Sequence, residues 1–343
     1  MKEVNVLRKT VLLTAIFLFC MSVATSADEP NEITHWEFQT VDSDGDPNYS
    51  GPNEVSLVGI ILNKPGDMVD PTPDYQGETA GNVGGQWQIF IQGMEGDHAG
   101  TAVWIGQNYS ATTSPPGENY TNEEWISELQ RLNAARFRPG DKVKVTGHYM
   151  GYKGKNNINE QHWVDPNYNF TIEVLEKNVG LAEPEVVTLD ELVNESGDFN
   201  FQQNRESGCE FYQSQLVRIN DVNFAASELD WGPDSGEEIS FYIKDSNGLE
   251  FPVKLGLGSG IYQGSNNLEG QFDVIGIFDQ EPPAPPYPPD GTSGYRIWVM
   301  DYDGNGEILG STEHIRACKP ADTNLDGTVD FGDFAKFAED WLK

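Results

Sequence analysis

The order of strand-like and helical segments between residues 55 and 175 constrains the fold of this chain more than any other feature. Three segments rich in β-branched and aromatic residues come first, a segment with helical spacing follows, and two more strand-like segments complete the series. Short runs of this composition, bounded by glycine, proline and aspartate, predict buried strands. The predicted strands are 55–62, 86–92, 100–106, 141–149 and 170–175, and the predicted helix is 121–133.

The predicted helix lies between the third and the fourth strand. One helical face carries Trp125, Ile126, Leu129 and Leu132, and Thr121 with Glu124 forms a capping box at the start of the helix. A helix at this place in a five-stranded Greek-key barrel is the arrangement of the OB-fold. We therefore expect residues 54–180 to form an OB-fold-like domain.

A second series of strand-like segments follows a linker and a short helix within 181–194. The segment 87–93 resembles 240–246 in its pattern of aromatic and polar residues, which indicates an internal duplication. The strands expected in this half are 215–224, 239–244, 249–255, 271–278 and 295–300. The fold class expected is therefore all-β, with two OB-fold-like five-stranded barrels in tandem, the second formed by residues 181–315.

The first 27 residues have the pattern of a secretory signal peptide. Three basic residues precede an apolar run, and small residues at its end offer a cleavage site. We therefore expect export to the extracellular space or the periplasm, with no membrane span after cleavage. Residues 28–53 form a polar N-terminal segment, in which the aspartates at 42–46 favour a solvated turn over a metal site.

The charge of the chain argues against nucleic acid as its partner. Removal of residues 1–27 takes away three basic residues and one acidic residue, which leaves 18 against 54 and a net charge of −36. Proteins that bind nucleic acid usually carry a basic surface that neutralises phosphates. A strongly acidic surface suits a protein kept soluble among extracellular divalent cations.

Residues 322–333 have the spacing of a calcium-binding loop. Oxygen-bearing side chains stand at loop positions 1, 3, 5, 9 and 12, and Gly327 stands at position 6, where the chain must turn sharply. Ca²⁺ takes six to eight oxygen ligands, which such a loop supplies, and an amphipathic helix follows it. The alternative for this segment is an acidic, solvated tail that binds no metal. Residues 301–308 have a similar spacing, but position 12 of that segment is Thr312, so we expect a turn there rather than a metal site. The expected Ca²⁺ ligands are Asp322, Asn324, Asp326, Thr328 through its carbonyl, Asp330 and Asp333.

The aspartate at position 12 of this loop gives it a resemblance to a single dockerin type I repeat, of the kind found in secreted planctomycete-type proteins. The resemblance covers about 21 residues and implies a calcium-binding repeat at 316–343. It also implies a cohesin-like or cell-surface protein partner and a role in extracellular polysaccharide degradation. Phe331 and Gly332 stand where dockerins often carry Ser or Thr, which leaves open whether the partner is a cohesin. The phrases Pro-x-x-Val-Thr-Leu at 184–189 and Tyr-Arg-Ile-Trp at 295–298 resemble secreted bacterial tandem OB-fold regions.

The loop at 148–163 is the predicted ligand-binding region of the first barrel. OB-folds bind oligosaccharides or oligonucleotides through the loop between strands four and five and through the face of strands two and three. Aromatic rings, amides and amines are concentrated in this loop, and a polysaccharide suits them and the acidic chain. The alternative is a hairpin whose aromatic rings pack on the barrel. The candidate ligand-binding residues are Tyr149, Tyr152, Lys153, Lys155 and Trp163.

Two tryptophans, on the predicted second and third strands, could either contact the ligand or pack in the core. Trp87 and Trp104 lie where either role is possible, and strand alternation favours the core for both.

The sequence contains no recognisable catalytic motif. His35, His98 and His314 are scattered and are expected at the surface, and the abundant acidic residues hide any carboxylate pair of a hydrolase. A hydrolase or a nuclease-associated protein that binds single-stranded nucleic acid is the alternative function, and spacer domains that contact only proteins are a third. Cys209 and Cys318 would form a disulfide in an oxidising compartment if they lie within reach of one another.

Overall fold

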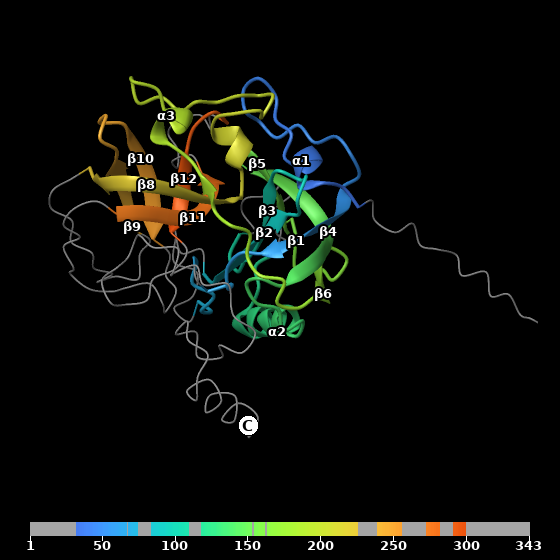
Figure 1. Cartoon of the computed structure of the whole chain (residues 1–343). Helices are drawn as coiled ribbons and strands as arrows, with labels where there is room; N and C mark the ends of the chain where they lie inside the picture. The colour runs from blue at the N-terminus through green and yellow to red at the C-terminus, as the bar shows by residue number, and fades with distance from the viewer. Residues whose placement is uncertain are drawn as a thin grey trace, which may run out of the picture.

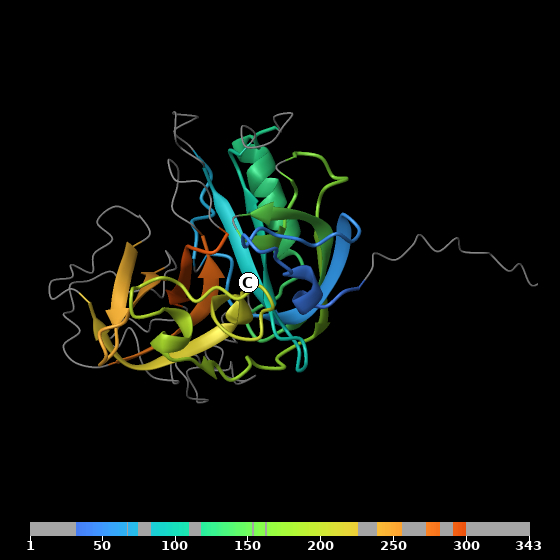
Figure 2. The same ribbon diagram turned by 90° about the horizontal axis from the view of Figure 1, so that it is seen from above.

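The computed structural model describes residues 32–66, 68–74, 84–109, 118–152, 154–161, 163–225, 239–255, 272–281 and 291–299. They form two β-rich units that lie side by side (Figure 1, Figure 2). Within these residues no helix is long and apolar enough to cross a membrane. The predicted signal peptide and the predicted calcium loop lie outside them.

The first unit is a closed barrel of five strands. Its elements are α1 (His35–Phe38), β1 (Glu54–Ile61), β2 (Gln86–Gly93), β3 (Gly100–Gly106), α2 (Asn122–Asn133), β4 (Lys142–Tyr152), β5 (Lys155–Ile158) and β6 (Thr171–Glu176). Strand β1 pairs with both β2 and β4, and β5 joins β4 to β3, to which it is parallel. The ring therefore runs β1-β2-β3-β5-β4 and returns to β1. With α2 between β3 and β4, this confirms the expected OB-like order.

The strand that closes the barrel is not the one that the sequence predicted. Residues 170–175 were expected as the fifth strand, but β6 pairs only with the outer edge of β4, and the four residues of β5 take its place. The sequence of β5 is Lys-Asn-Asn-Ile, which carries no alternation of apolar and polar residues. Its polar side chains are nevertheless buried, because their partners come from other parts of the chain.

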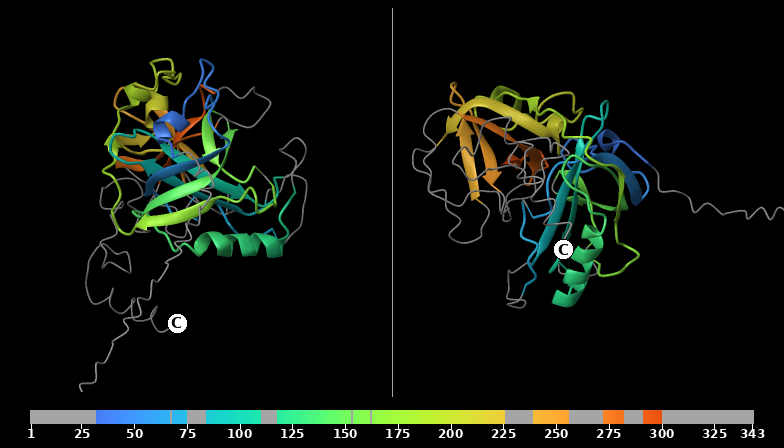
Figure 3. Two further views of the ribbon diagram at one scale, coloured as in Figure 1. Left: turned by 90° about the vertical axis from the view of Figure 1, so that its right-hand side faces the viewer. Right: turned by 60° about the horizontal axis from the view of Figure 1, so that its bottom comes forward.

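Strand alternation places the core of the first unit inside the barrel. Trp87, Ile89 and Ile91 of β2 point inward together with residues of the four other barrel strands, and Trp125 and Leu132 of α2 cover the open end. Ile126, expected on the same face of α2, is instead 37% exposed. Figure 3 shows α2 along that end of the barrel. Trp87 belongs to the core, as expected, whereas Trp104 faces outward and is only partly buried.

The segment before β1 packs onto the first unit. Phe38 lies in the barrel core, and the Gln39 side chain exchanges two hydrogen bonds with the Asn156 backbone, at 2.8 and 3.0 Å. His35 is fully buried, with Nδ1 2.8 Å from the Thr101 hydroxyl, so the expectation of a surface histidine is wrong. The turn at 42–46 forms as predicted, because Asp42 Oδ1 accepts the backbone N–H groups of residues 44 and 46.

The second unit contains the strands that the sequence predicted, within two residues at each end. Its elements are β7 (Glu185–Val186), α3 (Leu189–Leu192), η2 (Cys209–Tyr212), β8 (Leu216–Phe224), β9 (Ile239–Lys244), β10 (Glu250–Leu255), β11 (Phe272–Gln280) and β12 (Tyr295–Val299). The pairings follow β8-β9-β10-β12-β11, β11 also pairs with β8, and β10 is parallel to β12. Each of these pairings has its counterpart in the first unit, whereas the parallel pairing of β7 with β8 is an addition in the second.

The two units share an apolar contact. Phe90 and Ala102, on the outer side of β2 and β3, pack against Ile277 and Trp298 of β11 and β12. Direct hydrogen bonds reinforce this contact, because the Gly100 N–H donates to the Gln213 carbonyl at 2.9 Å. Further along the junction the His98 ring stacks on Phe211, and the Arg205 guanidinium lies 4.1 Å from the centre of the Trp36 ring.

Candidate functional site

The predicted ligand-binding residues of the 148–163 region occupy three different environments. Tyr149 packs edge-on against Phe38 and Tyr49, with ring centres 5.8 and 5.1 Å apart, and its hydroxyl donates to the Tyr49 carbonyl. Trp163 is partly buried and stacks on Tyr168, with ring centres 6.1 Å apart. Tyr149 is therefore a packing residue at the end of the barrel core. Lys153 lies outside the described residues.

Lys155 is inside the junction between the units rather than on the ligand-facing surface expected for it. Only 4% of the residue is exposed, and its ammonium group donates to the Asp279 carboxylate of β11. An ammonium group is removed from water only at a large cost unless a carboxylate compensates it. The Asp279 carboxylate provides that compensation and so links β5 to the second unit.

Asp279 is the centre of a wider polar network. Its carboxylate also accepts the Arg296 guanidinium at 3.1 Å and the Trp298 indole N–H at 2.8 Å. Burial acts to raise the pKa of Asp279, but Lys155 and Arg296 outweigh it and lower the pKa to about 2. The carboxylate is therefore ionised at any physiological pH.

Glu281 continues this network toward the surface. It accepts the Arg296 guanidinium and the Tyr152 hydroxyl, the latter at 3.5 Å, and its carboxylate lies 4.0 Å from the Lys254 ammonium. We call Lys155, Lys254, Asp279, Glu281 and Arg296 the junction cluster. It holds three cations and two carboxylates.

The Trp298 ring lies against two cations of the junction cluster. The Lys254 ammonium and the Arg296 guanidinium lie 4.4 and 4.7 Å from the centre of its ring. Burial, together with the nearby Arg296, lowers the pKa of Lys254 to about 8. The cluster is thus mostly buried around the Trp298 ring, and its most exposed member is the carboxylate of Glu281.

Two exposed tyrosine rings flank the junction cluster. Tyr152, the last residue of β4, is 38% exposed, and Tyr242 on β9 is 55% exposed. Tyr242 stands opposite Pro252 on β10, and Lys254 lies two residues further along that strand. Residues two apart on a strand share a face, so Tyr242, Pro252 and Lys254 lie on the same side of the second unit.

The sequence carried a signal for part of this site. In 295–298, Tyr-Arg-Ile-Trp, every side chain is large, as expected of a strand with both faces covered, and Arg296 and Trp298 form its outer face. Phe90 likewise indicates that the outer face of β2 is covered, because it is an apolar residue at a position where the alternation of β2 predicts a polar one. Tyr242 and Glu281 gave none, because an isolated tyrosine and a glutamate in an acidic chain are ordinary.

A second polar cluster lies where α2 covers the barrel. The Tyr120 hydroxyl donates to Glu160, while Arg131 donates to Glu128 and lies 3.4 Å from Glu160. Burial and then the charge of Glu128 raise the pKa of Glu160 to about 8. This cluster fastens α2 to the barrel.

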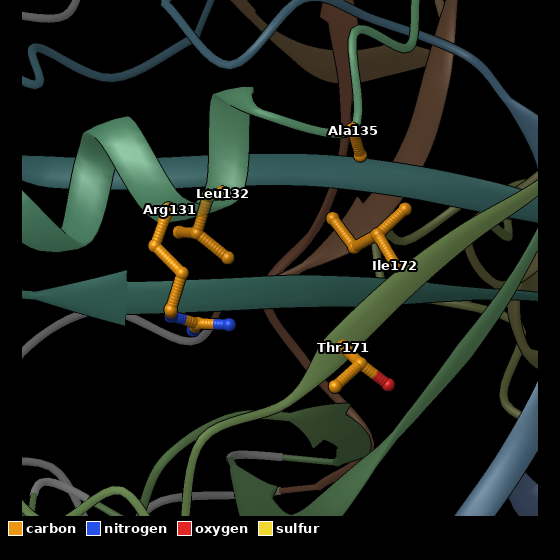
Figure 4. A pocket seen from close by; sticks show the side chains of 5 residues that line it. All are labelled: Arg131, Leu132, Ala135, Thr171 and Ile172. Atoms are coloured by element: carbon orange, nitrogen blue, oxygen red, sulfur yellow. The ribbon is translucent and has the colours of Figure 1, made fainter.

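A pocket of about 260 Å³ opens beside Arg131 of this cluster (Figure 4). Its other lining residues, Leu132, Ala135, Thr171 and Ile172, offer one hydroxyl and otherwise apolar surface.

The expected calcium ligands, 322–333, lie outside the described residues, as does Cys318. Within the described residues no group of three or more His, Cys, Asp or Glu side chains is placed to hold a metal ion. Cys209 is buried, and its Sγ lies 3.2 Å from the Leu192 carbonyl oxygen. Its disulfide with Cys318 stays a prediction.

Comparison with known proteins does not identify a family for this chain. No protein-family model matches the chain, and no curated protein matches it. Among solved structures, a replication protein A heterotrimer bound to single-stranded DNA aligns over 78% of this chain and 68% of that chain, with 7% sequence identity. Its TM-score of 0.22 is too low to carry an argument about fold or function.

Proposed function

We propose that this protein is a secreted, calcium-binding recognition protein that attaches to extracellular polysaccharide and does not itself catalyse a reaction. The observation that carries the proposal is the closed ring β1-β2-β3-β5-β4 with α2 between β3 and β4. Barrels of this order bind oligosaccharides or oligonucleotides on their outer surface. The chemistry of that surface then decides between the two classes of ligand.

We also propose that the second unit is an OB-like barrel of the same order. Support comes from its pairings, which run β8-β9-β10-β12-β11 with an added β11–β8 contact and a parallel pair at the matching place. A duplicated unit would give the protein two copies of one binding architecture, of which each could keep or lose its ligand.

Charge favours a glycan over nucleic acid. The chain without residues 1–27 carries a net charge of −36, whereas affinity for a phosphate backbone depends on many unpaired cations. The three cations of the junction cluster already face Asp279 and Glu281. Stacking on tyrosine rings and hydrogen bonds to hydroxyl groups need no excess of positive charge.

The C-terminal repeat completes the proposed role. Its resemblance to a dockerin supports binding of Ca²⁺ by residues 322–333 and attachment to a cohesin-like or cell-surface protein. A chain that binds a glycan with its barrels and a protein with its C-terminal repeat would act as an adaptor in polysaccharide degradation. The predicted signal peptide supports delivery of this adaptor outside the cell or to the periplasm.

A binding screen with the full secreted chain tests the proposal. Probes would be soluble β-glucan, xylan, mannan, polygalacturonan and a 20-nucleotide single-stranded DNA, each measured by affinity electrophoresis at two salt concentrations. We expect binding to at least one glycan that changes little with salt. Binding to DNA alone, with steep salt dependence, would replace the proposal with the nucleic-acid alternative. Absence of binding to every probe would leave the barrels as spacers.

A further inference from the structure

We infer that the glycan lies across both units, on a strip that runs from Tyr242 over Lys254 and Glu281 to Tyr152. This inference rests on the proposed function and names the ligand as a neutral polysaccharide chain. Neither unit contains the whole strip, because Tyr152 ends β4 of the first unit and the other three residues belong to the second.

The first unit presents only part of the surface on which an OB-fold usually holds its ligand. That surface is the outer face of its second and third strands, here β2 and β3. Phe90 and Ala102 on this face are buried against Ile277 and Trp298. Lys155, on the adjacent β5, is buried with Asp279. The partner that covers this face is the second unit of the same chain.

The second unit covers the first with only part of the corresponding face. Its contact residues come from β11 and β12, whereas β9 and β10 carry Tyr242 and Pro252 on their outer side. Tyr242 is more than half exposed as a residue, although its ring is large and apolar on both faces. The corresponding face of the second unit is therefore divided between a contact with the first unit and an exposed aromatic surface.

A continuous series of neighbours connects Tyr242 to Tyr152. Diagonal neighbours on adjacent strands lie about 7–8 Å apart, and Lys254 stands in that relation to Tyr242. The Lys254 ammonium lies 4.0 Å from the Glu281 carboxylate, which accepts the Tyr152 hydroxyl at 3.5 Å. Two exposed phenol rings thus stand at the ends of a short polar strip.

The chemistry of this strip suits a neutral sugar chain. Sugar rings offer apolar C–H faces that pack on tyrosine rings, and their hydroxyl groups both donate and accept hydrogen bonds. Glu281 supplies a partly exposed acceptor, and the largely buried Lys254 and Arg296 hold its carboxylate in place. A polyanion would bring its own charge onto a surface whose cations already have carboxylate partners, in a chain of net charge −36. A neutral chain avoids that repulsion.

Single ring deletions test the strip in the full chain. The variants are Tyr242→Ala and Tyr152→Ala, each with its Phe counterpart to keep the ring, and Trp163→Ala is the matched aromatic control from outside the strip. We expect each Ala variant to weaken binding to the preferred neutral glycan about tenfold, the loss expected for one stacked ring of about 1.4 kcal/mol. The Phe variants should bind within about threefold of the wild type, and circular dichroism checks that every variant is folded.

The outcomes separate this inference from the proposed function. Glycan binding that survives both Ala variants but is lost in Trp163→Ala would overturn the strip and return the site to the 148–163 region, with the proposed function intact. Stronger binding to polygalacturonan than to β-glucan, xylan and mannan would overturn the neutral class of ligand. Loss of binding in only one of the two Ala variants would confine the site to one unit and overturn its composite nature. Failure of the wild type to bind any glycan would overturn the proposed function itself.

Discussion

Lys155 and Asp279 form an ion pair between the two units, and almost none of either residue is exposed to solvent. Lys155 stands at the start of the strand that closes the first barrel, and Asp279 stands near the end of β11 in the second. The pair therefore couples closure of one unit to the position of the other. Arg296 and Trp298 donate to the other carboxylate oxygen of Asp279, so both oxygens accept hydrogen bonds.

Removal of one member of this pair should destabilise the whole molecule. We expect Lys155→Met to lower the free energy of unfolding by about 3 kcal/mol, because it leaves a buried carboxylate with one cation fewer. Lys244→Met is the matched control, since its 3.3 Å pair with Glu250 is exposed and should contribute less than about 0.5 kcal/mol. Urea denaturation of both variants measures the difference, and equal effects would contradict a role for the buried pair.

Gly100 should tolerate no side chain, because the second unit approaches its backbone directly. A β-carbon at Gly100 would collide with the Ser214 carbonyl oxygen, and the Gly100 N–H already donates to the Gln213 carbonyl. We expect Gly100→Ala to cost about 1–3 kcal/mol, the usual range for overpacking against a fixed backbone. Gly66→Ala is the control, because the nearest atoms to its β-carbon would be 3.8 Å away. Thermal unfolding should separate the two variants, and a neutral Gly100→Ala would argue against close contact of the units.

The sequence predicts the strands of this fold well because their burial follows local patterns. The run at β1 and the alternation of β8 are visible in the residues themselves, and the capping box of Thr121 and Glu124 marks the start of α2. These features depend on neighbours within a few positions along the chain. Local physical chemistry is therefore enough to place them.

The parts that sequence reasoning missed depend on partners far away in the chain. Strand β5 is polar, and Asn156 is buried because Gln39 reaches it from 117 residues earlier. Lys155 is buried because Asp279 reaches it from 124 residues later. His35 is likewise enclosed by the side chains of Asp97 and Thr101. No periodicity marks such residues, since their burial follows from polar contacts rather than from an apolar face.

The C-terminal loop should bind one Ca²⁺ ion. We expect isothermal titration of the chelator-treated chain to show a single site, and Asp326→Ala or Asp333→Ala to weaken it by at least about tenfold, or about 1.4 kcal/mol. Asp42→Ala is the control, because Asp42 Oδ1 is already engaged by two backbone N–H groups in its turn. Loss of the ion in Asp42→Ala rather than in the loop variants would move the calcium site to the N-terminal turn.

Glu160 should make the stability of the protein depend on pH. Its pKa is raised to about 8 by burial and by Glu128, so the folded state keeps a proton that the unfolded state releases at about 4.5. Stability therefore falls as the pH rises from about 4.5 to about 8. Glu160→Gln mimics the protonated form, and we expect it to be more stable than the wild type at pH 8.5, by up to about 5 kcal/mol, and within about 1 kcal/mol of it at pH 5.

Measuring Glu160→Gln against the wild type separates the effect of Glu160 on stability from that of other groups that titrate between about pH 4.5 and 8. The pKa of Glu210 is also raised, to about 7, but Glu210 is present in both proteins and cancels in the difference. Glu123→Gln, an exposed substitution on the first turn of α2, is the matched control and should show no such pH dependence. Urea denaturation at pH 5, 7 and 8.5 gives the three differences. A Glu160→Gln difference that stays constant across them would mean that Glu160 is ionised throughout and that Arg131, rather than a proton, neutralises it in the folded state.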